Sequence, residues 1–171
     1  PRDNKPYHDD VTNEWVAPFF MAAINTKNVH RSNQMLNHPY GEDFLYDEMF
    51  SAGPGEEGEK KAQAIAMYNP MLGDNVPKPG EGPSKESREN GNYDVLFCAD
   101  LADGSSIHAA VSGDMDPGYG STSKMIAESA ICLVKECPEL PGGIYTPAPA
   151  MGEKLIARLQ ASAGLTFKIE D

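Results

Sequence analysis

The sequence predicts an α+β fold in which a mixed, mostly antiparallel sheet carries helices mainly on one face. Two strand-like runs, 92–101 and 105–114, flank an Asp103-Gly104 pair. Three stretches space their apolar residues like helices, and helices and strands alternate without a strict βαβ rhythm. The 171 residues suit one domain or slightly more. We therefore expect an irregular segment at 1–14 and one domain over 15–171.

The first part of that domain begins at Trp15, where the sequence changes from polar to apolar. Apolar side chains near helical spacing predict a helix over 16–36, with Pro18 in its first turn and Asn37 as its C-cap. The stretch FLYDEMF, residues 44–50, alternates in the manner of a strand.

Residues 52–91 hold seven glycines and five prolines, which predicts a flexible excursion. Within it, 56–69 is expected to be a helix that begins with acidic residues, and 71–91 a long loop. A loop of that length is either a poorly ordered surface segment or a functional one.

The second half of the chain has the clearest pattern. The Asp103-Gly104 pair favours a type I′ hairpin turn, and the apolar run at 95–98 predicts that this hairpin is central in a sheet and covered on at least one side by helices. A helix over 121–136 follows, then a short strand at 143–147, a helix over 149–162 and a last strand at 165–170. The buried stripe of the first helix is predicted to be Met125, Ile126, Ser129, Ala130, Leu133 and Val134.

Composition excludes several classes of function. The net charge of -12 argues against a nucleic-acid partner and against anionic membrane surfaces. The chain has no run of eighteen apolar residues, so no membrane span is predicted. Three cysteines without CxxC spacing fit reduced thiols and a cytoplasmic location. The four histidines lack HxxxH or HExxH spacing, so no metal site is expected.

Two stretches contain candidate binding residues. In DPGYGSTSK, 116–124, Ser121 has the chemistry of an N-cap, and hydroxyls beside a helix start can bind an anion. The stretch is neither a Walker A sequence nor GxGxxG, so a plain capped turn and an anion site both stay open. Asn25 and Arg31 lie in the polar second half of the 16–36 helix. With Tyr40 and Tyr46 they form either a pocket lining or a solvated helix end.

Four segments together resemble a known family: VAPFFMAAINTKNVHRSNQML, HPYGEDFLYDEMF, PKPGEGPSKESRENGNYDVLF and SGDMDPGYGSTSKMIAESAICL. From about Trp15 to Glu170 the chain resembles the C-terminal half of saccharopine-dehydrogenase-like oxidoreductases, with trans-acting enoyl reductases as the nearest branch. The stretches PGEGPS and DPGYGSTSKM are typical of that group.

The resemblance implies a two-part enzyme. An N-terminal Rossmann domain would bind NAD or NADP, and a second α+β domain would cover the cleft and mediate dimers. This sequence has no initiating Met and its 116–124 turn is not GxGxxG, so we expect it to be the second domain alone, inactive by itself and without a cofactor of its own. The expected partners are a small-molecule or acyl substrate, the protein's own Rossmann domain and a second copy.

Site residues are assigned from side-chain chemistry within that framework. Asn25, Arg31, Tyr40 and Tyr46 are expected on the substrate side, and Tyr119, Ser121 and Thr122 near the cofactor. Catalytic residues, the substrate, NAD versus NADP, the direction of hydride transfer and the oligomeric state stay open. The alternatives are a non-catalytic binding or homodimerisation module, and a ligand-binding protein with 52–91 as its lid.

Overall fold

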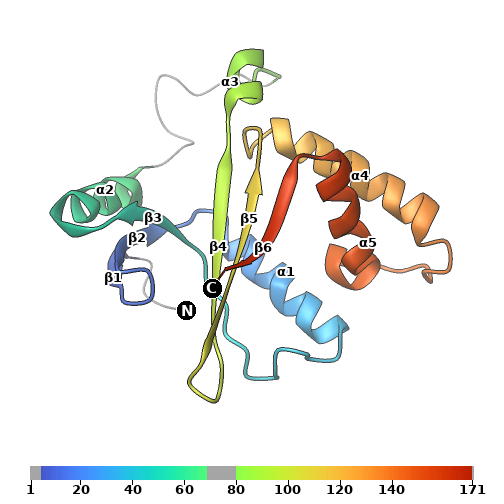
Figure 1. Cartoon of the computed structure of the whole chain (residues 1–171), viewed down its shortest axis with the longest axis horizontal. Coiled ribbons are helices and arrows are strands. Elements are labelled where there is room, and N and C mark those ends of the chain that lie inside the picture. The colour runs from blue at the N-terminus through green and yellow to red at the C-terminus, as the bar shows by residue number, and fades with distance from the viewer. Residues whose placement is uncertain (1–4, 69–79, 171) are drawn as a thin grey trace. The chain divides into compact units, whose positions relative to one another are not determined.

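The computed structural model describes residues 5–68 and 80–170, and the chain divides into two compact units, 1–77 and 78–171 (Figure 1). Each unit contains its own three-stranded sheet, in which every described strand pair is antiparallel. The predicted α+β class is confirmed, although the strands form two sheets rather than one. We describe each unit by itself.

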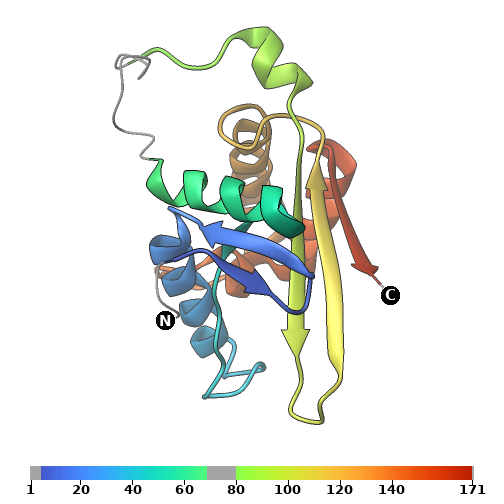
Figure 2. The same cartoon turned by 90° about the vertical axis from the view of Figure 1, so that its left-hand side faces the viewer.

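The sheet of unit 1 has the order β1 (Tyr7–Asp9), β2 (Glu14–Pro18) and β3 (Met49–Gly53). Helix α1 (Ala22–Met35) connects β2 toward β3, and helix α2 (Gly55–Met67) packs on β2 and β3 (Figure 2). Its core consists of small side chains, Ala17, Ala52 and Ala62, flanked by Trp15 and Ile65. Small side chains let the helix approach the sheet closely, and a Cβ on Gly58 of α2 would collide with the carbonyl oxygen of Gly53.

Three predictions for unit 1 need correction. Residues 1–14 are not irregular throughout, because β1 and the first residue of β2 lie there. The first helix begins at Ala22 rather than at 16, since Val16 and Ala17 are buried in β2 and Pro18 ends that strand. Its C-cap is Leu36, and Asn37 follows with a positive φ of 64°. Of the strand predicted at 44–50, only 49–50 belong to β3, whereas the predicted 56–69 helix is confirmed as α2.

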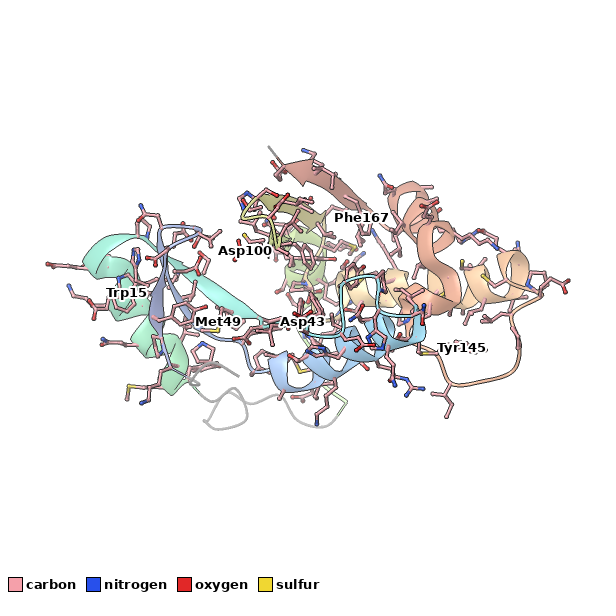
Figure 3. All side chains as sticks on the ribbon, turned by 90° about the horizontal axis from the view of Figure 1, so that it is seen from below. Trp15, Asp43, Met49, Asp100, Tyr145 and Phe167 are labelled. Atoms are coloured by element: carbon pink, nitrogen blue, oxygen red, sulfur yellow. The ribbon has the colours of Figure 1, made fainter. Side chains whose placement is uncertain are left out.

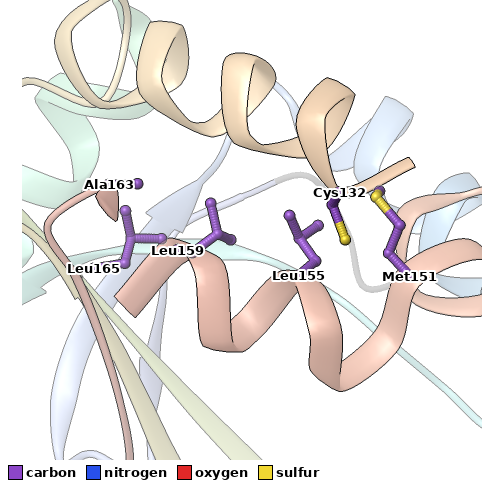
Figure 4. Close-up of a cluster of buried hydrophobic side chains, with 6 residues drawn as sticks. All are labelled: Cys132, Met151, Leu155, Leu159, Ala163 and Leu165. Carbon is purple, nitrogen blue, oxygen red and sulfur yellow. The ribbon is translucent and has the colours of Figure 1, made fainter. Parts of the chain in front are cut away.

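Unit 2 begins with the short helix α3 (Lys85–Asn90), followed by β4 (Tyr93–Asp100) and β5 (Ser106–Gly113). Two long helices, α4 (Gly120–Glu136) and α5 (Pro147–Ser162), precede the last strand, β6 (Leu165–Glu170). The strand order is β4-β5-β6, and α4 and α5 lie together beside β6 (Figure 1). Figure 4 shows the core between them: Cys132, Met151, Leu155, Leu159, Ala163 and Leu165.

Arg158 and Gly152 shape helix α5. The Arg158 guanidinium donates from Nε and Nη2 to Glu128 Oε2, at 2.8 and 2.6 Å, and from Nη1 to Glu136 Oε1, at 2.6 Å. Because both glutamates belong to α4, the arginine joins the two helices. Gly152 has φ 48° and ψ -131° inside α5, which no helical residue adopts, so the helix is kinked there.

The sequence predicted the hairpin and the two long helices of unit 2 but not their surroundings. The Asp103-Gly104 turn is not type I′: only Gly104 has a positive φ, and the Asp103 carboxylate accepts from the Ser105 N–H and hydroxyl. Of the hairpin predicted to be central, β5 is the central strand of its sheet but β4 is an outer strand. Residues 143–147 form no strand, because Pro147 begins α5. The loop predicted at 71–91 contains α3, and residues 71–79 lie outside the described residues.

The predicted buried stripe of α4 is also wrong in part. Ile126 is 69% exposed and Val134 is 78% exposed, whereas Cys132 is fully buried and Met125 packs against the core. The helix turns the face that carries Cys132 toward α5, so the predicted stripe lies partly off the buried face.

No helix in the described parts of the chain is both long and apolar enough to cross a membrane.

Candidate functional site

In unit 1, the Glu48 carboxylate joins two of the predicted substrate-side residues. The Asn25 side-chain amide donates to Glu48 Oε2 and the Tyr46 hydroxyl donates to Glu48 Oε1, both at 2.8 Å. Burial, first, and then the hydrogen bond and negative charge of Glu48 raise the pKa of Tyr46 far above that of an ordinary tyrosine. Tyr46 therefore stays a neutral hydrogen-bond donor. The sequence interpretation missed Glu48, although it lies two residues after Tyr46 in the alternating segment.

Tyr40 is positioned by a different residue, the buried Asn33. Asn33 is 3% exposed, accepts from the Tyr40 backbone N–H at 3.1 Å and donates to the Gly41 carbonyl at 2.8 Å. The Tyr40 and Phe44 rings lie 5.2 Å apart, and the His30 ring meets Phe44 edge-on at 5.6 Å. These contacts fold the segment after α1, marked by Asp43 in Figure 3, back onto the helix. Arg31 lies on an exposed part of α1.

In unit 2, the turn before α4 is closed by the carboxylate of Asp116. Asp116 accepts from the backbone N–H groups of Gly118, Tyr119 and Gly120 at 3.0, 3.1 and 2.5 Å. These N–H groups, the one of Gly120 above all, hold the pKa of the Asp116 carboxyl below its usual range. A bound anion would need the same donors. The structure therefore favours the capped turn over the anion site.

The three predicted cofactor-side residues have different surroundings in this turn. Ser121 is fully buried and its hydroxyl is hydrogen-bonded to the Tyr93 hydroxyl at 2.8 Å, so it is not the N-cap, which is Tyr119. The Thr122 hydroxyl donates to the Pro117 carbonyl at 2.6 Å, and the Tyr119 side chain is exposed. The capping role of Asp116 was within reach of the sequence, because an Asp before Pro-Gly commonly accepts from nearby backbone N–H groups.

Unit 2 also contains an apolar groove that the sequence interpretation missed. Its volume is about 440 Å³, within the range of small-ligand sites, and residues of α4, of the loop before α5 and of the start of α5 line it. Figure 3 labels Tyr145 in that loop. Most of the groove lining is apolar: Leu133, Leu140, Pro141, Gly142, Gly143, Tyr145, Thr146, Pro147, Ala150 and Met151. A strand predicted over 143–147 concealed this groove, because it placed these residues in a sheet.

Metal ligands do not gather in the described residues, where no group of three His, Cys, Asp or Glu side chains could hold an ion.

These features define a small α+β chain that offers hydroxyl-bearing side chains and an apolar groove, with its hydroxyl-rich turn closed by its own carboxylate. The chain is 34% identical over 177 residues to a protein of Mycobacterium tuberculosis (strain ATCC 25618 / H37Rv) that is provisionally named a trans-acting enoyl reductase. That alignment covers 93% of this chain and 42% of the relative. Trans-acting enoyl reductases of Mycobacterium bovis (strain BCG / Pasteur 1173P2) and Mycobacterium ulcerans (strain Agy99) are 28% and 31% identical, over 92% and 85% of this chain.

The chain spans less than half the length of these curated relatives, 42% and 39% for the last two. No family model matches the chain, and no solved structure matches it. The resemblance to trans-acting enoyl reductases is thus confirmed as a relationship to one portion of those proteins. The roles assigned to the seven site residues stay predictions.

Proposed function

We propose that this chain is the substrate-side portion of a larger NAD(P)-dependent oxidoreductase of the saccharopine-dehydrogenase-like class, close to its enoyl reductases. The observation that carries the proposal is the similarity of 93% of the chain to a portion that makes up 42% of a relative named as an enoyl reductase. The nicotinamide would supply hydride to, or take it from, a carbon–carbon or carbon–nitrogen double bond. This chain would bind and orient the substrate.

The geometry of unit 2 supports a cofactor site located mainly elsewhere in the larger protein. A dinucleotide pyrophosphate binds to unoccupied backbone N–H groups at a helix start that follows a parallel strand. In this chain the N–H groups of 118–120 are held by Asp116, and β5 runs antiparallel to both neighbouring strands. The exposed Tyr119 and the hydroxyl of Thr122 would approach the cofactor from the side of this turn.

The apolar groove supports an acyl substrate, because its lining offers hydrocarbon contact and few polar groups. Separately, Asn25, Arg31, Tyr40 and Tyr46 of unit 1 keep the substrate-side role that the sequence predicts for them. A cytoplasmic location agrees with Cys98, Cys132 and Cys137, which form no disulfide. A second copy of the chain is a further partner.

The proposal is tested by reconstitution with an NADP(H)-binding portion of the same protein. We expect the 171-residue chain alone not to bind NADPH in calorimetry, and the combined protein to oxidise NADPH with a trans-2-enoyl thioester. The nucleotide-binding portion alone should lack that activity. Micromolar NADPH binding by this chain alone, or equal turnover without it, would overturn the proposal.

A matched pair of variants tests the groove. Leu133 lines it, whereas its neighbour Val134 is 78% exposed and does not. Leu133→Lys should raise KM for a long-chain enoyl thioester in the combined protein, because it places a charge on an apolar surface. Val134→Lys should leave KM unchanged. Equal effects of both variants would argue against acyl binding in the groove.

A further inference from the structure

Among the strands that the structure describes, β4 is an outer strand of the sheet in unit 2, and its partner there is β5. Its pairing is regular over all eight residues, without a bulge. Val95 is 43% exposed, Leu96 51% and Phe97 41%. The middle of the strand, 95–99, contains no proline and no charged residue, lysine included. Proteins commonly protect an outer strand with such residues or with a bulge, because an exposed edge recruits further strands.

The hydrogen bonds of the hairpin determine which backbone groups point away from β5. The Leu101 N–H donates to the Ser105 carbonyl at 2.8 Å, so these two residues form a hydrogen-bonded pair. Such pairs alternate along an antiparallel ladder, so 99, 97, 95 and 93 direct their backbone groups toward β5. The backbone N–H and carbonyl of Asp94, Leu96 and Asp100 are therefore directed to the outer edge.

We propose that β4 pairs antiparallel with β4 of a second copy, with Leu96 opposite Leu96 of that copy, so that the two sheets continue across the dimer. The inference rests on the homodimer included in the proposed function and names the surface that would form it. Leu96 directs its N–H and carbonyl outward, so the two copies can exchange both hydrogen bonds at the symmetry axis.

Two registers give the greatest overlap of the two strands, and repulsion between carboxylates favours the one with Leu96 on the symmetry axis. Residues that oppose each other must share a face of the sheet, so the axis passes through a residue, and for greatest overlap that residue is Leu96 or Phe97. With Phe97 on the axis, Asp94 of each copy lies opposite Asp100 of the other, and like charges opposite each other destabilise a sheet. With Leu96 on the axis, Asp94 lies opposite Cys98 and Asp100 opposite Asn92, so no two carboxylates oppose each other.

The same register also gathers apolar side chains. Val95 lies opposite Phe97 of the second copy and Phe97 opposite Val95, on the face where β5 contributes Val111 and Ala109. Cross-strand pairs of aromatic and β-branched residues stabilise antiparallel sheets. The pairing would therefore cover exposed apolar surface and satisfy the outward backbone groups together.

The oligomeric state of the 171-residue chain tests the surface. Sedimentation velocity should give a dimer for the unchanged protein and about half that mass for Leu96→Lys, since lysine in an outer strand opposes pairing. Ile144→Lys is the control: Ile144 is also an exposed apolar residue of unit 2, outside the strands. A monomeric unchanged protein, or a Leu96→Lys variant that stays dimeric, would overturn the proposal.

Cross-linking tests the register independently of the charge variant. In a Cys98→Ser background, mild oxidation should link two copies of Leu96→Cys by a disulfide efficiently and two copies of Phe97→Cys poorly, with the background alone as the blank, because only the directly opposed pair has Cα atoms about 5.5 Å apart. Efficient linking of Phe97→Cys instead would show the other register and refute ours. A dimer with neither link would place the interface elsewhere, while NADPH-dependent turnover in the combined protein would still test the proposed function separately.

Discussion

The hydrogen bond between Ser121 and Tyr93 gives the sharpest test of whether Ser121 is structural. Ser121 is fully buried at the start of α4, and its hydroxyl lies 2.8 Å from the Tyr93 hydroxyl at the start of β4. Ser121→Ala removes one partner and leaves the half-buried Tyr93 hydroxyl without it. Tyr93→Phe does the reverse, and the double variant removes both.

The expected costs follow from this geometry. Leaving one buried polar partner unsatisfied costs about 1–3 kcal/mol, whereas replacing both partners with apolar groups is much less costly. Each single variant should therefore lower the free energy of unfolding by about 1–3 kcal/mol, and the double variant by less than the sum. The coupling energy should be on the order of 1 kcal/mol.

Urea unfolding followed by far-UV circular dichroism measures all three variants. Ser123→Ala is the control, because its hydroxyl donates only to the Gly120 carbonyl of its own helix. Strictly additive costs, or a Ser121→Ala variant as stable as the control, would refute the structural role. Ser121 would then be open again to a role at the cofactor.

Three further predictions concern other positions. Gly58→Ala should lower the melting temperature although alanine favours helices, because its Cβ would collide with the Gly53 carbonyl; a normal melting temperature would contradict the close packing of α2. The lowered pKa of the Asp116 carboxyl stabilises the folded chain above the ordinary Asp pKa of about 3.9, and this stabilisation is lost as the pH falls through the lowered value. The Asp116→Asn variant lacks that carboxyl, so its free energy of unfolding should fall less on acidification than that of the unchanged protein. The raised pKa of Tyr46 predicts stability that is complete below the ordinary tyrosine pKa of about 10 and declines as the pH rises toward the native value. Tyr46→Phe should flatten that decline of stability at alkaline pH. It should also remove a late step from the rise in tyrosinate absorbance with pH, and an unchanged absorbance curve would contradict the contact with Glu48.

The elements that sequence predicted well are those whose local signals agree with each other. The β4–β5 hairpin combines apolar strands with an Asp-Gly pair, and α5 ends where Ala163-Gly164 breaks the helix, with Gly164 at φ 73°. The 16–18 segment failed because Val16 and Ala17 fit a helical spacing equally well. Pairing with the neighbouring β1 and with β3, which lies more than thirty residues further along the chain, makes them a strand.

The candidate sites depended on contacts that no local pattern contains. Glu48 reaches Asn25 across 23 positions, and Ser121 reaches Tyr93 across 28, so neither pair was visible in the sequence. The stripe of α4 misled for the same reason: Ile126 and Val134 have the spacing of a core face, but the position of α5 buries Cys132. The Asp116 turn was the exception, since its acceptor and its donors lie within five residues.

The kink at Gly152 divides α5 into two helical segments whose directions are not fixed by one continuous helix. The short first segment, with Ala150 and Met151, forms one wall of the groove, and the longer second segment carries Leu155 and Leu159 into the core. Because Gly152 separates the two segments, a change of side-chain size at Ala150 can redirect that wall while the second segment keeps its place, whereas Met151 is shared with the core. Homologues could therefore differ in the width of this groove while keeping the same core.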